Sequence, residues 1–274
     1  MEKLQAALQK ARVQREEASD AQERASGRKA PAPKRPAGSV EARWASLQEL
    51  PLSERVLAEH LVVTQNVSKE ATPFDIMRTK VLLQMQKNGW TRLGITSPMP
   101  KSGKTTMACN LTLGFGRQDG MKSMLFDFDL NDPAVGEFLD CKSAGPISSM
   151  LSGDVPFDAH SKRIGQNIAV ASSGQKENDA TRVLLAPKTH DTLDAIQEAY
   201  KPDVMIFDLP SVLVGDNTRA FLKQLDCVLI VARAGVTKYA HFDKCEREIS
   251  DHTNVLGTVL NAFRVKDVEQ YVEG

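Results

Sequence analysis

The sequence predicts an α/β fold whose sheet is mostly parallel and carries helices on both faces. Three observations support this prediction. From about residue 50 onward, short apolar runs alternate with amphipathic stretches of helical length, as in proteins built from strand–helix–strand units. The candidate ligand-binding residues follow directly after the apolar runs, where open parallel sheets bind their ligands. The composition, with 41% apolar and 26% charged residues, is that of an ordinary soluble globular domain.

A tail precedes this domain. Residues 1–23 are rich in helix formers, but their apolar stripe is thin, so we expect a marginal helix. Residues 24–40 begin with a stretch of basic residues and contain several prolines, which predicts a disordered linker. We therefore expect a helical or disordered tail over 1–45 and one domain over 46–274. The linker is either a solvated spacer or a contact for anionic lipid, and the tail helix could dock on a partner.

The elements of the domain follow in order along the chain. A helix with one apolar face is expected over 73–88. The apolar runs predict strands at Arg92–Ser97, Ser123–Phe128, Ile168–Ser172, Val204–Asp208, Cys227–Ala232 and Val255–Asn261. The amphipathic stretches between them predict helices at 104–118, 180–200, 216–224 and 238–252.

Charge and cysteine usage exclude several classes of protein. Thirty-five Lys and Arg balance thirty-five Asp and Glu, so no net positive charge points to nucleic acid. The four cysteines are far apart and the five histidines show no metal-ligand spacing, which favours reduced thiols over zinc sites or disulfides. No apolar run reaches the roughly 20 residues of a membrane span, and the N-terminus lacks a signal-peptide core. We therefore expect a cytoplasmic protein that binds no nucleic acid.

A candidate phosphate-binding loop follows the first of these strands. The segment T-S-P-M-P-K-S-G-K-T-T leads from a strand into a helix, which is the context of a P-loop. In such a loop, Lys104 reaches the β- and γ-phosphates of ATP and Thr105 supplies one Mg²⁺ ligand. Pro98 stands where the motif has its first glycine, so the match is imperfect. The ATP-binding candidates of the loop are Pro100, Lys101, Ser102, Gly103, Lys104, Thr105 and Thr106.

Carboxylates end two further strands. Asp127 and Asp129 are two residues apart after an apolar run, so they lie on the same side of the strand's end. They could hold a Mg²⁺-bound water or take a proton from an attacking hydroxyl, although acidic residues also commonly end strands. Asp208 ends the run V-M-I-F, in the place of a Walker B carboxylate. The three motifs together predict a P-loop NTPase that binds ATP and Mg²⁺, with Thr105, Asp127 and Asp208 at the metal.

These motifs resemble those of the bacterial tyrosine kinases (BY-kinases) of capsule and exopolysaccharide synthesis, of the CpsD/CapB type, which are related to the MinD/ParA ATPases. The resemblance rests on T-S-P-M-P-K-S-G-K-T-T, D-F-D-L-N-D-P and D-L-P-S-V-L, and it covers about residues 50–262. It implies that Asp127 activates the tyrosine hydroxyl, that Asp129 assists the metal site and that Asp208 orients Mg²⁺ through water. It also implies that Asn261 reads adenine, whereas the residue type alone is equally typical of a turn cap.

The chain departs from the family pattern at several positions. Asn131 stands where the family has an arginine, so a positive charge is missing near the site. Met99 stands where MinD/ParA proteins carry their signature lysine, which argues against dimers of that kind. Of the family's E-x-x-R-x-x-R subunit contact only Arg78 is retained, so homo-oligomer formation stays open. The family's C-terminal tyrosine cluster is reduced to Tyr271, which is the candidate phospho-acceptor.

The resemblance implies an ATP-dependent protein-tyrosine autokinase that regulates capsule or exopolysaccharide polymerisation and export. Its catalytic residues would be Lys104, Asp127, Asp129 and Asp208. A separate membrane-embedded chain-length or export protein would be its partner and would hold it at the inner face of the plasma membrane. Three alternatives stay open: a nucleotide switch of the export complex without kinase activity, a scaffold without turnover, and a positioning ATPase like MinD or ParA.

Overall fold

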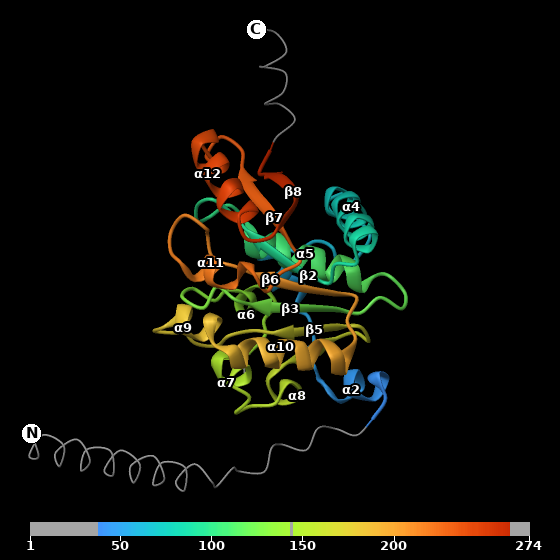
Figure 1. Cartoon of the computed structure of the whole chain (residues 1–274). Coiled ribbons are helices and arrows are strands. Elements are labelled where there is room, and N and C mark those ends of the chain that lie inside the picture. Colours follow the sequence, from blue (N-terminus) through green and yellow to red (C-terminus); the bar gives the residue numbers. More distant parts are fainter. Residues whose placement is uncertain (1–37, 143–144, 264–274) are drawn as a thin grey trace, which may run out of the picture. The chain divides into compact units, whose positions relative to one another are not determined.

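One eight-stranded sheet runs through the residues that the computed structural model describes, 38–142 and 145–263 (Figure 1). The strands lie side by side in the order β1-β4-β5-β3-β6-β2-β7-β8. Neighbouring strands are parallel except for β4 and β5, which are antiparallel. The strands are β1 (Gln48–Glu49), β2 (Arg92–Thr96), β3 (Ser123–Asp127), β4 (Lys162–Ile164), β5 (Ile168–Ala171), β6 (Val204–Asp208), β7 (Cys227–Arg233) and β8 (Asn254–Asn261). The mostly parallel sheet expected from the sequence is confirmed.

Each of the six strands expected from the apolar runs is present, with ends that differ by no more than one residue. The sequence did not predict β1 and β4, which have two and three residues. Both strands are exposed or half-buried over most of their length, so they lack the continuous apolar run by which buried strands are recognised.

The order of the strands brings the three motifs together. Strand β2 lies between β6 and β7, and the chain passes from β2 through a helix to β3, on the far side of β6. The carboxyl ends of β2, β6 and β3 are therefore neighbours. Each of these ends carries one of the motifs, at the position where open α/β sheets bind ligands.

Helices cover both faces of the sheet (Figure 1). One face packs against α3 (Glu54–Glu59), α4 (Thr72–Asn88), α5 (Lys104–Gly116) and α6 (Val135–Phe138). The other face packs against α2 (Val40–Ser46), α7 (Ile147–Leu151), α8 (Phe157–His160), α9 (Ala180–Leu185), α10 (Pro187–Tyr200), α11 (Asn217–Leu222) and α12 (Tyr239–Ser250). Within the described ranges, none of these helices has both the length and the apolar character of a membrane-spanning helix.

The single helix expected over 180–200 is wrong, because the chain forms two. Helix α9 ends at Leu185, and α10 begins at Pro187. Ala186 between them is extended, with φ −62° and ψ 130°. A residue before proline is disfavoured in the helical region, and proline itself is well suited to the first position of a new helix. The apolar spacing continues across this break, so periodicity alone did not reveal it.

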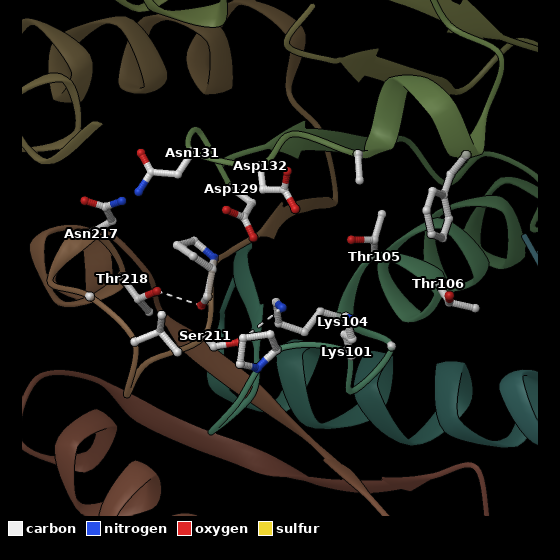
Figure 2. A pocket seen from close by; sticks show the side chains of 17 residues that line it. Lys101, Lys104, Thr105, Thr106, Asp129, Asn131, Asp132, Ser211, Asn217 and Thr218 are labelled. Carbon is white, nitrogen blue, oxygen red and sulfur yellow. Dashed lines mark hydrogen bonds between the residues drawn. The ribbon is translucent and has the colours of Figure 1, made fainter. Parts of the chain in front are cut away.

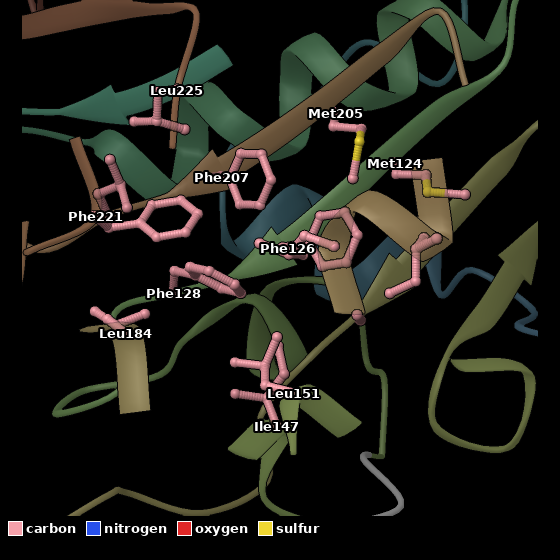
Figure 3. Close-up of a cluster of buried hydrophobic side chains, with 14 of the residues drawn as sticks. Met124, Phe126, Phe128, Ile147, Leu151, Leu184, Met205, Phe207, Phe221 and Leu225 are labelled. Atoms are coloured by element: carbon pink, nitrogen blue, oxygen red, sulfur yellow. The ribbon is translucent and has the colours of Figure 1, made fainter. Parts of the chain in front are cut away.

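An aromatic cluster fills the core on the α10 face, directly beneath the motif-bearing strand ends (Figure 3). Phe126 of β3 stacks on Phe207 of β6 with ring centroids 5.1 Å apart. Phe128 meets Phe221 of α11 edge-on at 4.7 Å. All four rings are fully buried. Close packing of large rings resists displacement, so the strands that end in Asp127 and Asp208 are held in a fixed register.

Helix α2 and strand β1 attach the start of the body to the edge of the sheet. Trp44 is 2% exposed, and its indole N–H donates to the carbonyl of Tyr200, at the end of α10, at 2.8 Å. The domain boundary expected after residue 45 would cut this helix, so we place the start of the body at Gly38. The tail helix expected over 1–23 and most of the expected linker lie outside the described residues.

Candidate active site

Asp127 and Asp208 are register partners at the ends of the adjacent strands β3 and β6. Both are fully buried. Thr105, in the first turn of α5, donates its hydroxyl hydrogen to Asp208 Oδ2 at 2.6 Å. The P-loop, the second motif and the Walker B candidate thus meet at one point, as the strand order requires.

The P-loop is shaped by two residues with left-handed backbone conformations. Gly103 has φ 92° and Lys101 has φ 61°. Gly103 caps α5, and a Cβ atom there would overlap the amide nitrogen of Asn261. Glycine is therefore required at this position on two grounds, its backbone conformation and the lack of space. The loop closes tightly around the helix N-terminus, where backbone N–H groups bind anions.

Strands β7 and β8 brace the loop from its other side. The Asn261 amide donates to the carbonyl of Ser102 at 2.9 Å, and the Arg233 guanidinium donates to the carbonyl of Lys101 at 2.7 Å. Asn261 also accepts a hydrogen bond from the N–H of Ala262. Its side chain thus acts as a turn cap and P-loop brace in this structure, and it does not line the cavity described next.

A cavity of about 480 Å³ opens above the P-loop (Figure 2). This volume falls within the range of small-molecule sites. The Lys104 ammonium points into the site and donates to Ser211 Oγ at 3.3 Å, and Asn131 and Asn217 lie away from the loop. The lining residues are Pro100, Lys101, Gly103, Lys104, Thr105, Thr106, Asp129, Asn131, Asp132, Ala134, Phe138, Pro210, Ser211, Val214, Gly215, Asn217 and Thr218.

The two buried carboxylates each keep one oxygen without a partner. Asp127 Oδ2 accepts from the N–H of Val135 at 3.0 Å, but Asp127 Oδ1 and Asp208 Oδ1 have no hydrogen-bond partner among the described residues. Burial, together with the charge of Asp208, raises the pKa of Asp127 well above its usual value. Burial raises the pKa of Asp208 to about 7, against the opposing effects of Lys104 and Thr105. A positive charge bound beside these two carboxylates would therefore stabilise their ionised forms.

Asp129 is one of two carboxylates that line the cavity. It is half-buried, and its burial raises its pKa, while nearby Lys104 opposes that rise. Asp132 also lines the cavity and pairs with Lys176 at 2.7 Å. Asn131, which stands where the kinases that the sequence resembles have an arginine, lines the cavity as well. Asp129 thus lines the cavity in front of the P-loop.

The structure brings together most of the residues that the sequence singled out. Lys104, Thr105 and the rest of the loop from Pro100 meet the three aspartates, with Asn261 behind the loop. Tyr271 lies outside the described residues. Sequence reasoning missed Ser211, Asn217 and Thr218. Ser211 could have been found from its place three residues after Asp208, whereas Asn217 and Thr218 are brought in only by the position of α11.

Mg²⁺ and ATP fit the residues present. A glycine-bearing nest at a helix N-terminus, a lysine and a threonine hydroxyl match the phosphate and metal requirements of a nucleotide. Two unpartnered carboxylate oxygens in a fully buried position match a dication, because a divalent charge nearby would lower the pKa of both groups.

Comparisons with known proteins identify similar chains, although no family model matches. The chain is 25% identical over 177 residues to the tyrosine-protein kinase CpsD of Streptococcus pneumoniae serotype 4, covering 63% of this chain and 76% of that protein. It is 23% identical over 220 residues to the tyrosine-protein kinase YwqD of Bacillus subtilis, covering 77% of this chain and 89% of that protein.

Solved structures show the same fold. The chimeric protein CapA2B2 superposes with a TM-score of 0.68 at 21% identity, covering 82% of this chain and 97% of that one. The cell-division ATPase MinD of Pyrococcus furiosus superposes with a TM-score of 0.54 at 20% identity, covering 67% and 79% of the two chains. Cobyrinic acid a,c-diamide synthase of Mycobacterium smegmatis, solved with bound ADP and magnesium, superposes with a TM-score of 0.53 at 19% identity, covering 67% and 80%.

Proposed function

We propose that this chain is an ATP-dependent phosphotransferase that transfers the γ-phosphoryl group of ATP to a tyrosine hydroxyl. The proposal draws on its resemblance to the bacterial tyrosine kinases of the CpsD and YwqD type, on the fold of the MinD-like P-loop ATPases. One observation carries this proposal: Lys104, Thr105 and Asp208 converge beneath a cavity that is also lined by a further carboxylate, Asp129, just after the end of β3. Lys104, Thr105 and Asp208 would bind the nucleotide, and Asp129 would meet the acceptor.

Each residue has a role set by its position. Lys104 and the loop N–H groups would bind the β- and γ-phosphates and stabilise the charge that develops during transfer. Thr105 and Asp208, joined by their hydrogen bond, would hold Mg²⁺, and Asp127 beside them would bind its water shell. Mg²⁺-ATP supplies the electrophilic phosphoryl group when bound.

Asp129 is the better-placed general base. The resemblance assigned this role to Asp127, but Asp127 is fully buried and does not line the cavity, whereas Asp129 does. A carboxylate with a raised pKa accepts a hydroxyl proton more readily than an ordinary one. We therefore propose that Asp129 takes the acceptor's proton and that Asp127 acts at the metal.

The biological setting is proposed from the resemblance to kinases of capsule and exopolysaccharide synthesis. The protein would act at the inner face of the plasma membrane with a separate membrane-embedded partner that controls chain length or export. We do not propose the family's ring contact. Asp75 pairs with Arg78 at 3.1 Å and with Arg117 at 2.9 Å, and Arg78 donates to the carbonyl of Gly114 at 2.8 Å. The charges of that element are thus engaged within the chain.

The test is phosphotransfer by the purified full chain with Mg²⁺-ATP and a random Glu–Tyr copolymer. We expect phosphotyrosine and ADP from the wild type, and a loss of about 100-fold or more in Lys104→Ala. Lys188→Ala is the matched control, because it removes an exposed lysine outside the cavity. Absence of phosphotyrosine on every acceptor would refute the kinase.

A second candidate function is a nucleotide switch without kinase activity, which Asn131 favours because it leaves the acceptor side of the cavity without the family's positive charge. In the same assay, ADP released without any phosphotyrosine would support this switch. Nucleotide binding without turnover would support a scaffold, and turnover stimulated by DNA would support a positioning ATPase.

A further inference from the structure

The ammonium group of Lys104 has a specific partner in this structure. Lys104 is 9% exposed, and its ammonium donates to Ser211 Oγ at 3.3 Å (Figure 2). Among the described residues, the partner is this neutral hydroxyl and not Asp129, one of the carboxylates that line the same cavity. An ammonium group has three N–H donors. One of them is bound to Ser211, so two remain for a ligand in the cavity.

The directions of the neighbouring hydrogen bonds follow from their partners. Ser97 donates its one hydroxyl hydrogen to the carbonyl of Met99 at 2.7 Å. The Ser97 hydroxyl oxygen also lies 3.1 Å from Ser211 Oγ. Since the hydrogen of Ser97 is already in use, Ser211 is the donor in this pair, and its lone pairs are left for Lys104, which can only donate. The chain of hydrogen bonds therefore runs from the lysine through both serines to the carbonyl of Met99.

The backbone around Ser211 is held in place on both sides. Ser211 is 5% exposed. The carbonyl of the preceding Pro210 accepts from the hydroxyls of Thr96 at 2.6 Å and Thr218 at 2.7 Å. The N–H of the residue after Ser211 donates to the carbonyl of Ser97 at 3.0 Å. The Ser211 hydroxyl is therefore a fixed acceptor, which defines one position for the ammonium group.

The chain of hydrogen bonds ends in the P-loop itself. The carbonyl of Met99 also accepts from the hydroxyl of Ser102 at 2.8 Å, and Lys104 comes two residues after Ser102. The network thus joins the tip of the lysine side chain to the loop that precedes it. Because all its members are hydrogen-bonded to one another, the network fixes the ammonium relative to the N–H groups of the loop before a ligand arrives.

We propose that Ser211 is a positioning residue, which holds the Lys104 ammonium in the orientation that binds the β- and γ-phosphates of ATP. This inference rests on the proposed function for the identity of the ligand. Fixing a lysine side chain costs conformational entropy, and with Ser211 in place that entropy is lost during folding instead of during binding. The bond to Ser211 persists beside two bonds to phosphate oxygens. Ser211 therefore strengthens ATP binding equally before and during transfer, and it leaves the transfer step itself unchanged.

The first experiment asks whether Ser211 acts through Lys104. Urea unfolding of the full chain without nucleotide is measured for the wild type, Ser211→Ala, Lys104→Ala and the double variant. We expect Ser211→Ala to lower the equilibrium constant for folding about tenfold more when Lys104 is present than when it is absent, because a hydrogen bond from a charged group is lost only in the first case. An equal loss in both backgrounds would show that Ser211 has no energetic coupling to the lysine and would overturn the proposal.

The second experiment measures ligand binding and turnover by the full chain. By calorimetry, Ser211→Ala is expected to bind Mg²⁺-ATP about tenfold more weakly than the wild type. With the Glu–Tyr copolymer, KM for ATP should rise by about the same factor while kcat stays within about twofold. Ser123→Ala is the matched control, because it removes a buried serine hydroxyl at the opposite end of β3 from Asp127. Its affinity, KM and kcat should equal those of the wild type.

The outcomes separate this proposal from the kinase proposal. An unchanged affinity for ATP in Ser211→Ala overturns the positioning role, whether or not the copolymer is phosphorylated. A lower kcat with an unchanged KM also overturns it, because that pattern indicates a loss of active protein or an effect confined to the transfer step. Weaker ATP binding by Ser211→Ala, with no phosphotyrosine formed by the wild type, supports the role of Ser211 and overturns the kinase alone. No ATP binding by the wild type overturns both.

Discussion

Replacing Asp208 by Asn is expected to stabilise the ligand-free protein at neutral and higher pH while abolishing its stabilisation by Mg²⁺-ATP. Asp208 is fully buried, lies beside Asp127 and has one oxygen without a partner. Ionising it in that position is costly, because no water solvates the charge. Asparagine has the same shape and no charge, and its oxygen can still accept from Thr105.

The magnitude follows from the raised pKa. The pKa of Asp208 rises from 3.8 to about 7, and about 1.4 kcal/mol per pKa unit gives up to about 4 kcal/mol. The folded state binds the proton more tightly than the unfolded state. The contribution of this proton to stability is therefore complete below about pH 4 and is lost as the pH rises through 7. The advantage of Asp208→Asn over the wild type should grow by about 3 kcal/mol between pH 5 and pH 8.

Urea unfolding of both proteins without nucleotide, at pH 5 and pH 8, measures this difference. Asp251→Asn is the control, because Asp251 is an exposed carboxylate at the end of α12, and its effect should stay within about 0.5 kcal/mol at both pH values. The refuting result concerns the difference in free energy of unfolding between Asp208→Asn and the wild type. If this difference were no more favourable to the variant at pH 8 than at pH 5, the argument that Asp208 bears an uncompensated charge would be wrong. Added Mg²⁺-ATP should raise the stability of the wild type only.

Three further predictions concern packing and loop geometry. In urea titrations, Trp44→Ala should lower the free energy of unfolding by about 3–5 kcal/mol, and Trp44→Phe should lower it by much less. Equal losses in the two variants would show that the hydrogen bond from Trp44 to Tyr200 outweighs the packing of the ring. Gly103→Ala should leave the fold unchanged by circular dichroism and weaken ATP binding at least tenfold by calorimetry, because position 103 has a φ of 92°. Adding Asn261→Ala should restore little of the ATP binding. Full recovery would mean that only the overlap of the new Cβ with Asn261 mattered. Asp75→Asn should cost about 1–3 kcal/mol because it loosens both guanidinium groups at once, and an unchanged melting temperature would contradict this.

The buried sheet and the three motifs could be predicted from the sequence because their signals are local. The runs ending in Asp127 and Asp208 are apolar throughout, as strands covered on both faces must be. A P-loop requires a strand, a loop and a helix in immediate succession, so it is visible without tertiary information. Few strand orders are compatible with this succession of strands and helices, which is why the contact of Thr105 with Asp208 could be expected.

The remainder of the site depends on contacts between distant segments. Asn217 and Thr218 enter the cavity because α11 packs beneath the loop that follows β6, and no local pattern marks them. Asn261 faces the P-loop because β8 pairs with β7, and its contact with Ser102 joins residues far apart in sequence. Trp44 was expected in the tail, because only its burial against Tyr200 shows that it belongs to the body.

The two prolines of the phosphate-binding loop have a consequence for how the site receives its ligand. Pro98 and Pro100 have fixed φ angles and no N–H. The loop is also tied through its carbonyls to Leu213, Arg233 and Asn261. The loop is thus preorganised, and much of the conformational entropy that a flexible glycine-rich loop loses on binding is lost here during folding. Recognition of phosphate should therefore proceed with little ordering, and the specificity of the site should be set by the residues after Ser102, which still offer their N–H groups.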